Sequence, residues 1–238
     1  MNEERRTHPS RFDRCKPATV FILLLIASPC LSGCGGNEAA HSSSEVKGSF
    51  NIETLYVAPF HVATERYEVG TTMQCSMCGA VFVTGPVSSG DDVFMTEQLL
   101  AFLRSETPYV VIPPEAGKGE RYQILSDSLS VSRQALLLQM GENLGAEAVV
   151  SGTLFRFKQR EGTGFSVETP ASVAFSVYLV RVSDGRLLWD GHFDQTQKPL
   201  SEDFTRFFSL VKSGWGWLTA EQLAQQGMEQ VMDSFPVP

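Results

Sequence analysis

The chain has 238 residues, of which 42% are hydrophobic, so it is long enough to bury a substantial core. Its 19 basic and 27 acidic residues give a net charge of −8. An acidic surface repels phosphate backbones and gains nothing from counterion release, so we expect no nucleic acid among its partners.

The N-terminal residues have the pattern of a secretion signal. An apolar run from Pro17 to Leu31 follows a basic N-terminus, and it is shorter than the roughly 20 residues that a membrane-spanning helix needs. Such a run ahead of small residues is typical of a signal peptide. We therefore predict a signal peptide at residues 1–33, with an ordinary secretory signal or an uncleaved anchor as the alternatives.

Leu31-Ser32-Gly33-Cys34 closes the apolar run and resembles a bacterial lipobox. The resemblance implies that Cys34 becomes the first residue of the mature chain and binds the membrane through a diacylglycerol and further acyl chains such as palmitate, which together hold a protein firmly. Gly35, rather than Asp, follows the cysteine. By resemblance to enterobacterial sorting, this favours the periplasmic face of the outer membrane over the inner membrane.

The remaining chain divides by composition into three parts. Residues 34–49 are rich in Gly, Ser, Asn and Ala, so we predict a lipidated cysteine followed by a flexible tether. An α+β domain is predicted at 50–200, with a cysteine-bearing insertion at 61–90, and a C-terminal aromatic and helical segment at 201–238. Five of the 19 basic and three of the 27 acidic residues precede the lipobox cysteine, so the mature chain has a net charge of −10.

Hydrophobic patterning predicts a mixed β-sheet of about five strands with two helices packed on it, in the order β-α-β-α-β-β-β, plus a C-terminal helical segment. The predicted strands are Glu53–Phe60, Tyr109–Ile112, Ala146–Phe157, Ala171–Val182 and Leu187–Phe193. Tyr109–Ile112 is wholly apolar, which is typical of a central strand. Ser183-Asp184-Gly185 predicts the turn of a hairpin, because Asp-Gly suits a type I′ turn.

Capping residues locate the predicted helices. The first begins at Asp91 or Asp92 and ends at Thr107-Pro108. The second spans Leu129 to Leu144, with Gly145 as C-cap, and follows a predicted loop from Glu115 to Asp127. The third is opened by Thr219 and Gln222 as a capping box, and its apolar stripe predicts a buried face.

Three segments together resemble one family of periplasmic lipoprotein domains: Leu55 to Phe60, Leu144 to Leu154, and Val177 to Trp189 with its Asp-Gly turn. The family comprises the curli secretion channel subunit CsgG, the penicillin-binding-protein activator LpoB and the N-terminal domain of TolB. The resemblance covers residues 53–196. It implies a fold that binds other envelope proteins or oligomerises and carries out no chemistry.

Cys75-Ser76-Met77-Cys78-Gly79 is the sharpest chemical feature of the sequence. A disulfide that staples the insertion suits an oxidising compartment. A thiol-redox centre needs the first cysteine at a helix N-terminus, and the β-branched residues after Gly79 argue against a helix there. Zinc prefers four ligands, so His41, His61 or a second subunit has to complete a zinc site. All three interpretations stay open.

Four aromatic residues of the C-terminal segment, Phe207, Phe208, Trp215 and Trp217, admit two interpretations. They form a lid on the core, or they form an apolar interaction surface. His61 and His192 lie in strand-like contexts, where a single histidine is more often structural than a ligand. No catalytic or nucleotide-binding motif occurs, so we predict no enzyme activity and no cofactor.

The sequence therefore predicts a membrane-anchored periplasmic lipoprotein that acts as a non-enzymatic assembly or adaptor component of a cell-envelope complex. Its expected partners are the membrane, through the lipid on Cys34, other envelope proteins and further copies of itself as a homo-oligomer. The alternative is a periplasmic thiol-redox or metal-binding protein that uses Cys75 and Cys78.

Overall fold

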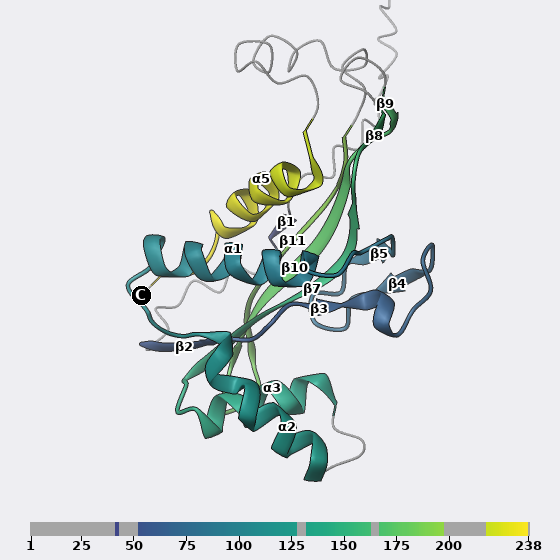
Figure 1. Cartoon of the computed structure of the whole chain (residues 1–238). Helices are drawn as coiled ribbons and strands as arrows, with labels where there is room; N and C mark the ends of the chain where they lie inside the picture. The colour runs from purple at the N-terminus through teal and green to yellow at the C-terminus, as the bar shows by residue number, and fades with distance from the viewer. Residues whose placement is uncertain (1–40, 43–51, 128–131, 163–166, 198–217, 238) are drawn as a thin grey trace, which may run out of the picture. The chain divides into compact units, whose positions relative to one another are not determined.

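A mixed β-sheet occupies the centre of the computed structural model (Figure 1), which describes residues 41–42, 52–127, 132–162, 167–197 and 218–237. These residues belong to one unit, Asn37–Pro238. The seven-stranded sheet has the order β1-β11-β10-β7-β2-β6, and β3 pairs with β7 beside this path. Its strands are β1 (His41–Ser42), β2 (Thr54–Val57), β3 (His61–Val62), β6 (Val110–Ile112), β7 (Ala148–Lys158), β10 (Ser172–Arg181) and β11 (Leu187–Thr196). The predicted mixed α+β fold is confirmed.

The predicted hairpin of alternating residues forms β10 and β11, which pair antiparallel with Phe175 opposite Phe193. The turn closes through a hydrogen bond of 2.9 Å from the N–H of Arg181 to the carbonyl of Arg186. Four residues therefore lie in the loop, rather than the two of a type I′ turn. Gly185 has a φ of +68°, a left-handed conformation that glycine adopts without a Cβ clash.

Parallel strands make up the other half of the sheet. β2 lies between β7 and β6 and pairs parallel with both. β6 is therefore an edge strand, and the prediction of a central strand at Tyr109–Ile112 was wrong. Val110 is 63% exposed at this edge. An apolar run alone does not distinguish a central strand from an edge strand whose faces are partly covered by helices.

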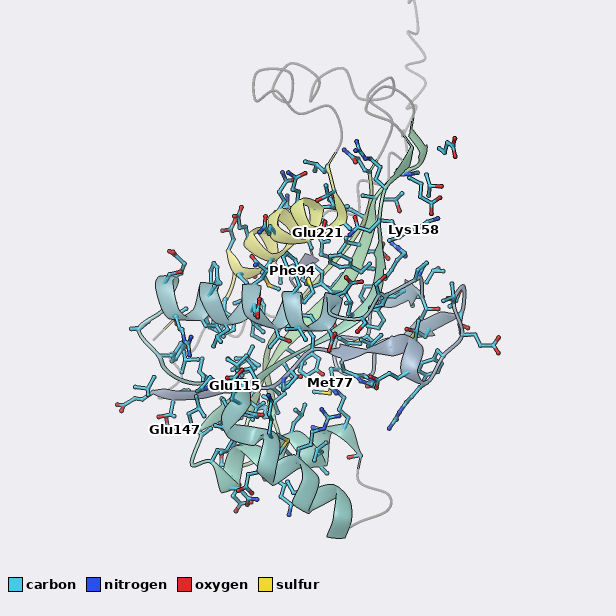
Figure 2. The ribbon with its side chains drawn as sticks, viewed as in Figure 1. Met77, Phe94, Glu115, Glu147, Lys158 and Glu221 are labelled. Atoms are coloured by element: carbon cyan, nitrogen blue, oxygen red, sulfur yellow. The ribbon has the colours of Figure 1, made fainter. Side chains whose placement is uncertain are left out.

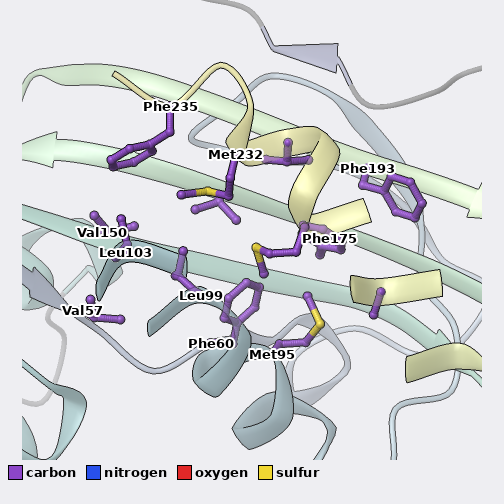
Figure 3. Close-up of a cluster of buried hydrophobic side chains, with 14 of the residues drawn as sticks. Val57, Phe60, Met95, Leu99, Leu103, Val150, Phe175, Phe193, Met232 and Phe235 are labelled. Carbon is purple, nitrogen blue, oxygen red and sulfur yellow. The ribbon is translucent and has the colours of Figure 1, made fainter. Parts of the chain in front are cut away.

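Two helices cover one face of the sheet: α1 (Asp91–Glu106) and α5 (Ala220–Met232). The first helix ends as predicted, and Thr219 and Gln222 form the predicted capping box of α5. The largest core cluster lies between these helices and the sheet (Figure 3). It includes Met95 and Leu99 of α1, Met228 and Met232 of α5, and the β10 residues Val173, Phe175, Val177 and Leu179.

The opposite face is covered in two places. The helix α3 (Arg133–Asn143) packs Leu137 and Met140 against Tyr178 and Val180 of β10. A helix α2 (Lys118–Asp127), preceded by the 3-10 turn η2 (Pro114–Gly117), contacts α3. The predicted loop at 115–127 was therefore wrong, because a polar segment with two glycines folds as a helix where a neighbouring helix contacts it. α3 begins after an N-cap at Ser132, and residues 128–131 lie outside the described part.

The predicted insertion contributes the second cover of this face. Its residues form β3, the 3-10 turn η1 (Ala63–Glu65), and a hairpin of β4 (Thr72–Gln74) and β5 (Val81–Val83). A second small hairpin, β8 (Glu161–Gly162) and β9 (Val167–Thr169), follows β7. β1 lies within the predicted tether and pairs with β11, His41 opposite His192.

Candidate functional site

The hairpin of β4 and β5 carries the two cysteines in its turn. The N–H of Cys75 donates to the carbonyl of Ala80 at 2.8 Å, and the N–H of Gly79 donates to the carbonyl of Cys75 at 2.9 Å. Gly79 has a φ of +72°, which only glycine adopts freely. No helix follows Gly79, since β5 starts at Val81, which confirms the sequence argument against a helix at this point.

Both cysteines are free thiols, and the sulfur of Cys75 accepts a hydrogen bond. The backbone N–H of Cys78 donates to the Sγ of Cys75 at 3.2 Å, and this sulfur lies 3.8 Å from the Oγ of Ser176 on β10. Cys75 is only 5% exposed, whereas Cys78 is half-buried. The disulfide between them remains a prediction.

The hydrogen bonds separate the two thiols in acidity. The thiol of Cys78, together with the backbone N–H groups of Cys78 and Met77, lowers the pKa of Cys75 to about 6, although burial acts in the opposite direction. The pKa of Cys78 is raised by the hydrogen bond with Cys75 and by burial. Donors that point at a sulfur favour its anionic form, so the turn is built to hold a thiolate at Cys75.

Sulfur-containing side chains gather on the inner side of this hairpin. Met73, Met77 and Cys78 pack against the same cluster as Cys75, Phe82 and Phe155. The rings of Phe82 and Phe155 stack with their centroids 3.9 Å apart, which fixes the hairpin on β7. Met77 also contacts the α3 side of the sheet face, and Figure 2 shows it between the hairpin and the helices α2 and α3. We call Met73, Cys75, Met77 and Cys78 the sulfur cluster.

Two arginines, Arg133 of α3 and Arg156 of β7, form hydrogen bonds with polar groups of the sheet beneath the hairpin and α3. Arg133 donates from Nε to the Oη of Tyr178 at 3.1 Å and from Nη2 to the Oγ of Ser151 at 3.0 Å. Arg156 donates to the carbonyl of Val83 at 2.8 Å. It also donates to the Oγ of Ser172 at 2.6 Å and forms an ion pair with Asp194. Arg156 therefore ties the hairpin to the sheet.

Two histidines lie on one row across this face. His61 is in register with Thr153, Thr153 with Ser176, and Ser176 with His192. Strands are about 4.8 Å apart, so His61 lies two strand spacings from Ser176. Burial, followed by the charges of nearby arginines, lowers the pKa of His61 to about 4, although Glu65 approaches its Nδ1 at 3.4 Å. Burial dominates because Glu65 is exposed.

In the part of the chain that the structure describes, no group of three or more His, Cys, Asp or Glu side chains is placed to hold a metal ion. His61 therefore does not complete a zinc site with Cys75 and Cys78. The strand order gives the reason. Cys75 contacts Ser176 on β10, and β7 lies between β10 and the strand β3 that carries His61. Among the described residues, no helix is long and apolar enough to cross a membrane.

The outer side of the hairpin carries exposed apolar residues that the sequence did not single out. Val81 and Val83 are 62% and 46% exposed, and Tyr67 and Val69 are 44% and 61% exposed. The segment around Val69 adjoins β5, because the N–H of Gly70 donates to the carbonyl of Thr84 at 2.9 Å. We call Tyr67, Val69, Val81 and Val83 the hairpin patch.

The other predicted site residues are not placed. Cys34 and the aromatic residues Phe207, Phe208, Trp215 and Trp217 lie outside the described residues. Lipidation of Cys34 and an interaction surface at the aromatic residues therefore remain predictions.

No protein-family model matches the sequence, and no curated protein matches it. Among solved structures, the chain is similar to the PelC dodecamer from Paraburkholderia phytofirmans, with 13% identity and a TM-score of 0.47, over 82% of this chain and 94% of that chain. It is also similar to the LpoB C-terminal domain from Salmonella enterica, with 15% identity and a TM-score of 0.38, over 63% of this chain and 87% of that chain.

The lipoprotein GNA1162 from Neisseria meningitidis is similar as well, with 14% identity and a TM-score of 0.39, over 68% of this chain and 94% of that chain. At these values the likenesses carry no argument about function. LpoB, one of the proteins in the sequence-based resemblance, is among the similar structures. For CsgG and TolB the resemblance remains a prediction.

Proposed function

We propose that the chain is a lipid-anchored protein of the bacterial cell envelope, held by Cys34 at the periplasmic face of the outer membrane. Its α+β domain has a non-enzymatic assembly or adaptor role there. The observation that carries the proposal is Leu31-Ser32-Gly33-Cys34 at the end of a short apolar run. Because β1 pairs with β11, only six residues separate Cys34 from the sheet, and a tether of that length reaches roughly 15 Å, so we place the partners close to the membrane surface.

The hairpin patch supports the adaptor role. Four apolar side chains that are 44–62% exposed lie on neighbouring segments of one insertion. Contiguous exposed apolar residues on a folded domain mark contacts with other proteins. We propose that other envelope proteins and further copies of this chain bind at the patch.

Fractionation of cells that express the full chain tests the anchor. Cys34→Ala should abolish acylation and release the chain from the membrane fraction or leave it unprocessed. Cys30→Ala is the matched control, because it removes a cysteine from the predicted signal peptide and leaves the lipobox intact. Membrane retention of Cys34→Ala at the wild-type level contradicts the anchor.

Site-specific photocrosslinking tests the patch. A crosslinking side chain at position 81 or 83 should capture an envelope protein or a second copy of the chain, and Val81→Lys should remove a capture made from position 83. Position 93 is the control, because Val93 is 53% exposed on α1, outside the hairpin. Equal capture from all three positions, or from none, contradicts an adaptor surface at the hairpin.

A further inference from the structure

The sulfur cluster is the second feature of the hairpin, and the adaptor role does not use it. Four sulfur atoms come from six consecutive residues, Met73 to Cys78, and all four side chains belong to one packed cluster. Met73 lies opposite the buried Phe82 in the register of the hairpin, and residues opposite each other share a face. The thioether of Met73 therefore lies on the inner side, as Cys75 does two residues later.

The turn holds the two thiols together. The backbone N–H of Cys78 donates to the Sγ of Cys75 at 3.2 Å, which places the two cysteines side by side in the turn. The left-handed Gly79 and the bond from Cys75 to Ala80 fix this geometry in the backbone. Two thiols are thus arranged in advance, which lowers the entropic cost of binding one ion between them.

The ligand types decide which ion fits. Structural zinc takes four N, S or carboxylate ligands, and the described part of the chain brings no third His, Cys, Asp or Glu to this pair. The additional donors present are the thioethers of Met73 and Met77. Thiolate and thioether ligands select a soft ion such as Cu(I), which accepts a pair of thiolates.

We propose that Cys75 and Cys78 bind one Cu(I) ion as thiolates, with Met73 and Met77 as neighbouring soft donors. Binding displaces both thiol protons and forms two copper–sulfur bonds without any change of oxidation state. Cys78 and Met77 are half-buried, so the ion enters from their side, whereas Cys75 lies deeper against Ser176. A Cys75–Cys78 disulfide consumes the same two sulfurs, so the site exists only in the reduced protein.

The full chain tests this when it carries Cys15→Ser, Cys30→Ser and Cys34→Ser, because Cys75 and Cys78 are then its only thiols. It is purified in detergent, reduced, and titrated with Cu(I) under anaerobic conditions against a chromogenic Cu(I) chelator. We expect one Cu(I) per chain. Binding should be lost on Cys75→Ser or Cys78→Ser, with circular dichroism confirming that each variant is folded.

The methionines provide a graded test. Met73→Leu combined with Met77→Leu should weaken Cu(I) binding by about tenfold, the usual scale for a ligand's neighbours. Met228→Leu is the matched control, because Met228 of α5 packs in the core on the opposite face of the sheet, and it should leave the affinity unchanged. No Cu(I) uptake by the fully reduced chain, undiminished uptake by Cys75→Ser, or tighter binding of Zn(II) than of Cu(I) overturns the proposal. None of these results depends on membrane anchoring or on capture of a partner.

Discussion

Replacement of Arg156 by alanine should release the hairpin from the sheet. Arg156 is 14% exposed, and its guanidinium donates to the carbonyl of Val83 at 2.8 Å and to the Oγ of Ser172 at 2.6 Å. Hydrogen bonds from a charged donor contribute about 1.5–3 kcal/mol each, so the two bonds together contribute about 3–6 kcal/mol. The ion pair with Asp194 adds at most about 1 kcal/mol, because Asp194 is 28% exposed and solvent screens the pair.

Two measurements separate loss of docking from general damage. Urea denaturation should show the lower free energy of unfolding. The melting temperature should fall by roughly 6–24 °C, because each kcal/mol shifts it by about 2–4 °C in a chain of this size. The reaction of a thiol reagent with Cys75, which is 5% exposed in the docked hairpin, should accelerate at temperatures well below unfolding. Arg156→Lys keeps the charge but loses the planar fork of donors, so it should recover only part of the stability.

Arg104→Ala is the control for charge removal, because Arg104 is exposed on α1. It should change the free energy of unfolding by less than about 0.5 kcal/mol and leave thiol reactivity unaltered. If Arg156→Ala resembles Arg104→Ala in both measurements, the hairpin is held by its aromatic packing alone, and the reasoning from hydrogen bonds is refuted.

Three further predictions concern stability and use chemical denaturation. A Cβ added at Gly152 clashes with the Phe60 ring, so Gly152→Ala should lower the free energy of unfolding by about 1–3 kcal/mol. In a Phe60→Ala background the same substitution should have no effect, and an unchanged loss of stability there contradicts the clash. Because the pKa of His61 lies at about 4 in the fold and 6.5 in the unfolded chain, the unfolded chain binds the proton first, and stability should fall as the pH drops from about 6.5 to about 4. His61→Asn should flatten that part of the pH profile, and an unaltered profile counts against the shift. Thr219→Ala removes the hydroxyl that accepts a hydrogen bond from the backbone N–H of Gln222, so the free energy of unfolding should fall by about 1 kcal/mol. Full wild-type stability would show that packing alone fixes the start of α5.

The sequence predicted those elements whose local signals agree with their packing. At α5, the capping box and the apolar stripe point to the same helix, and the structure places Leu223, Met228 and Val231 of that stripe in the core. In β10, strict alternation reflects two faces with different neighbours. In such segments the local sequence pattern and the tertiary contacts favour the same secondary structure, so a helix or strand can be predicted without knowing the fold.

Segments whose state is set by distant contacts were missed. The α2 segment is polar and contains Gly119, so its own residues favour a loop, yet it packs beside α3, where Asn143 donates to Glu120 at 2.8 Å. The hairpin patch was missed for a related reason. Ala80 to Val83 is a continuous apolar run, and only the pairing with β4 shows that Phe82 points inward while Val81 and Val83 point outward.

β10 shows how one strand serves both the core and the candidate site. Its odd-numbered residues from Val173 to Leu179 are wholly buried against the helices α1 and α5. Its even-numbered residues change character along the strand, since Ala174 packs under the hairpin and Tyr178 under α3. Ser176 lies between them, where its hydroxyl meets the Sγ of Cys75. A small polar residue at this point leaves room for a sulfur and offers it a donor, whereas a large apolar residue would fill the space where the hairpin seats its first cysteine.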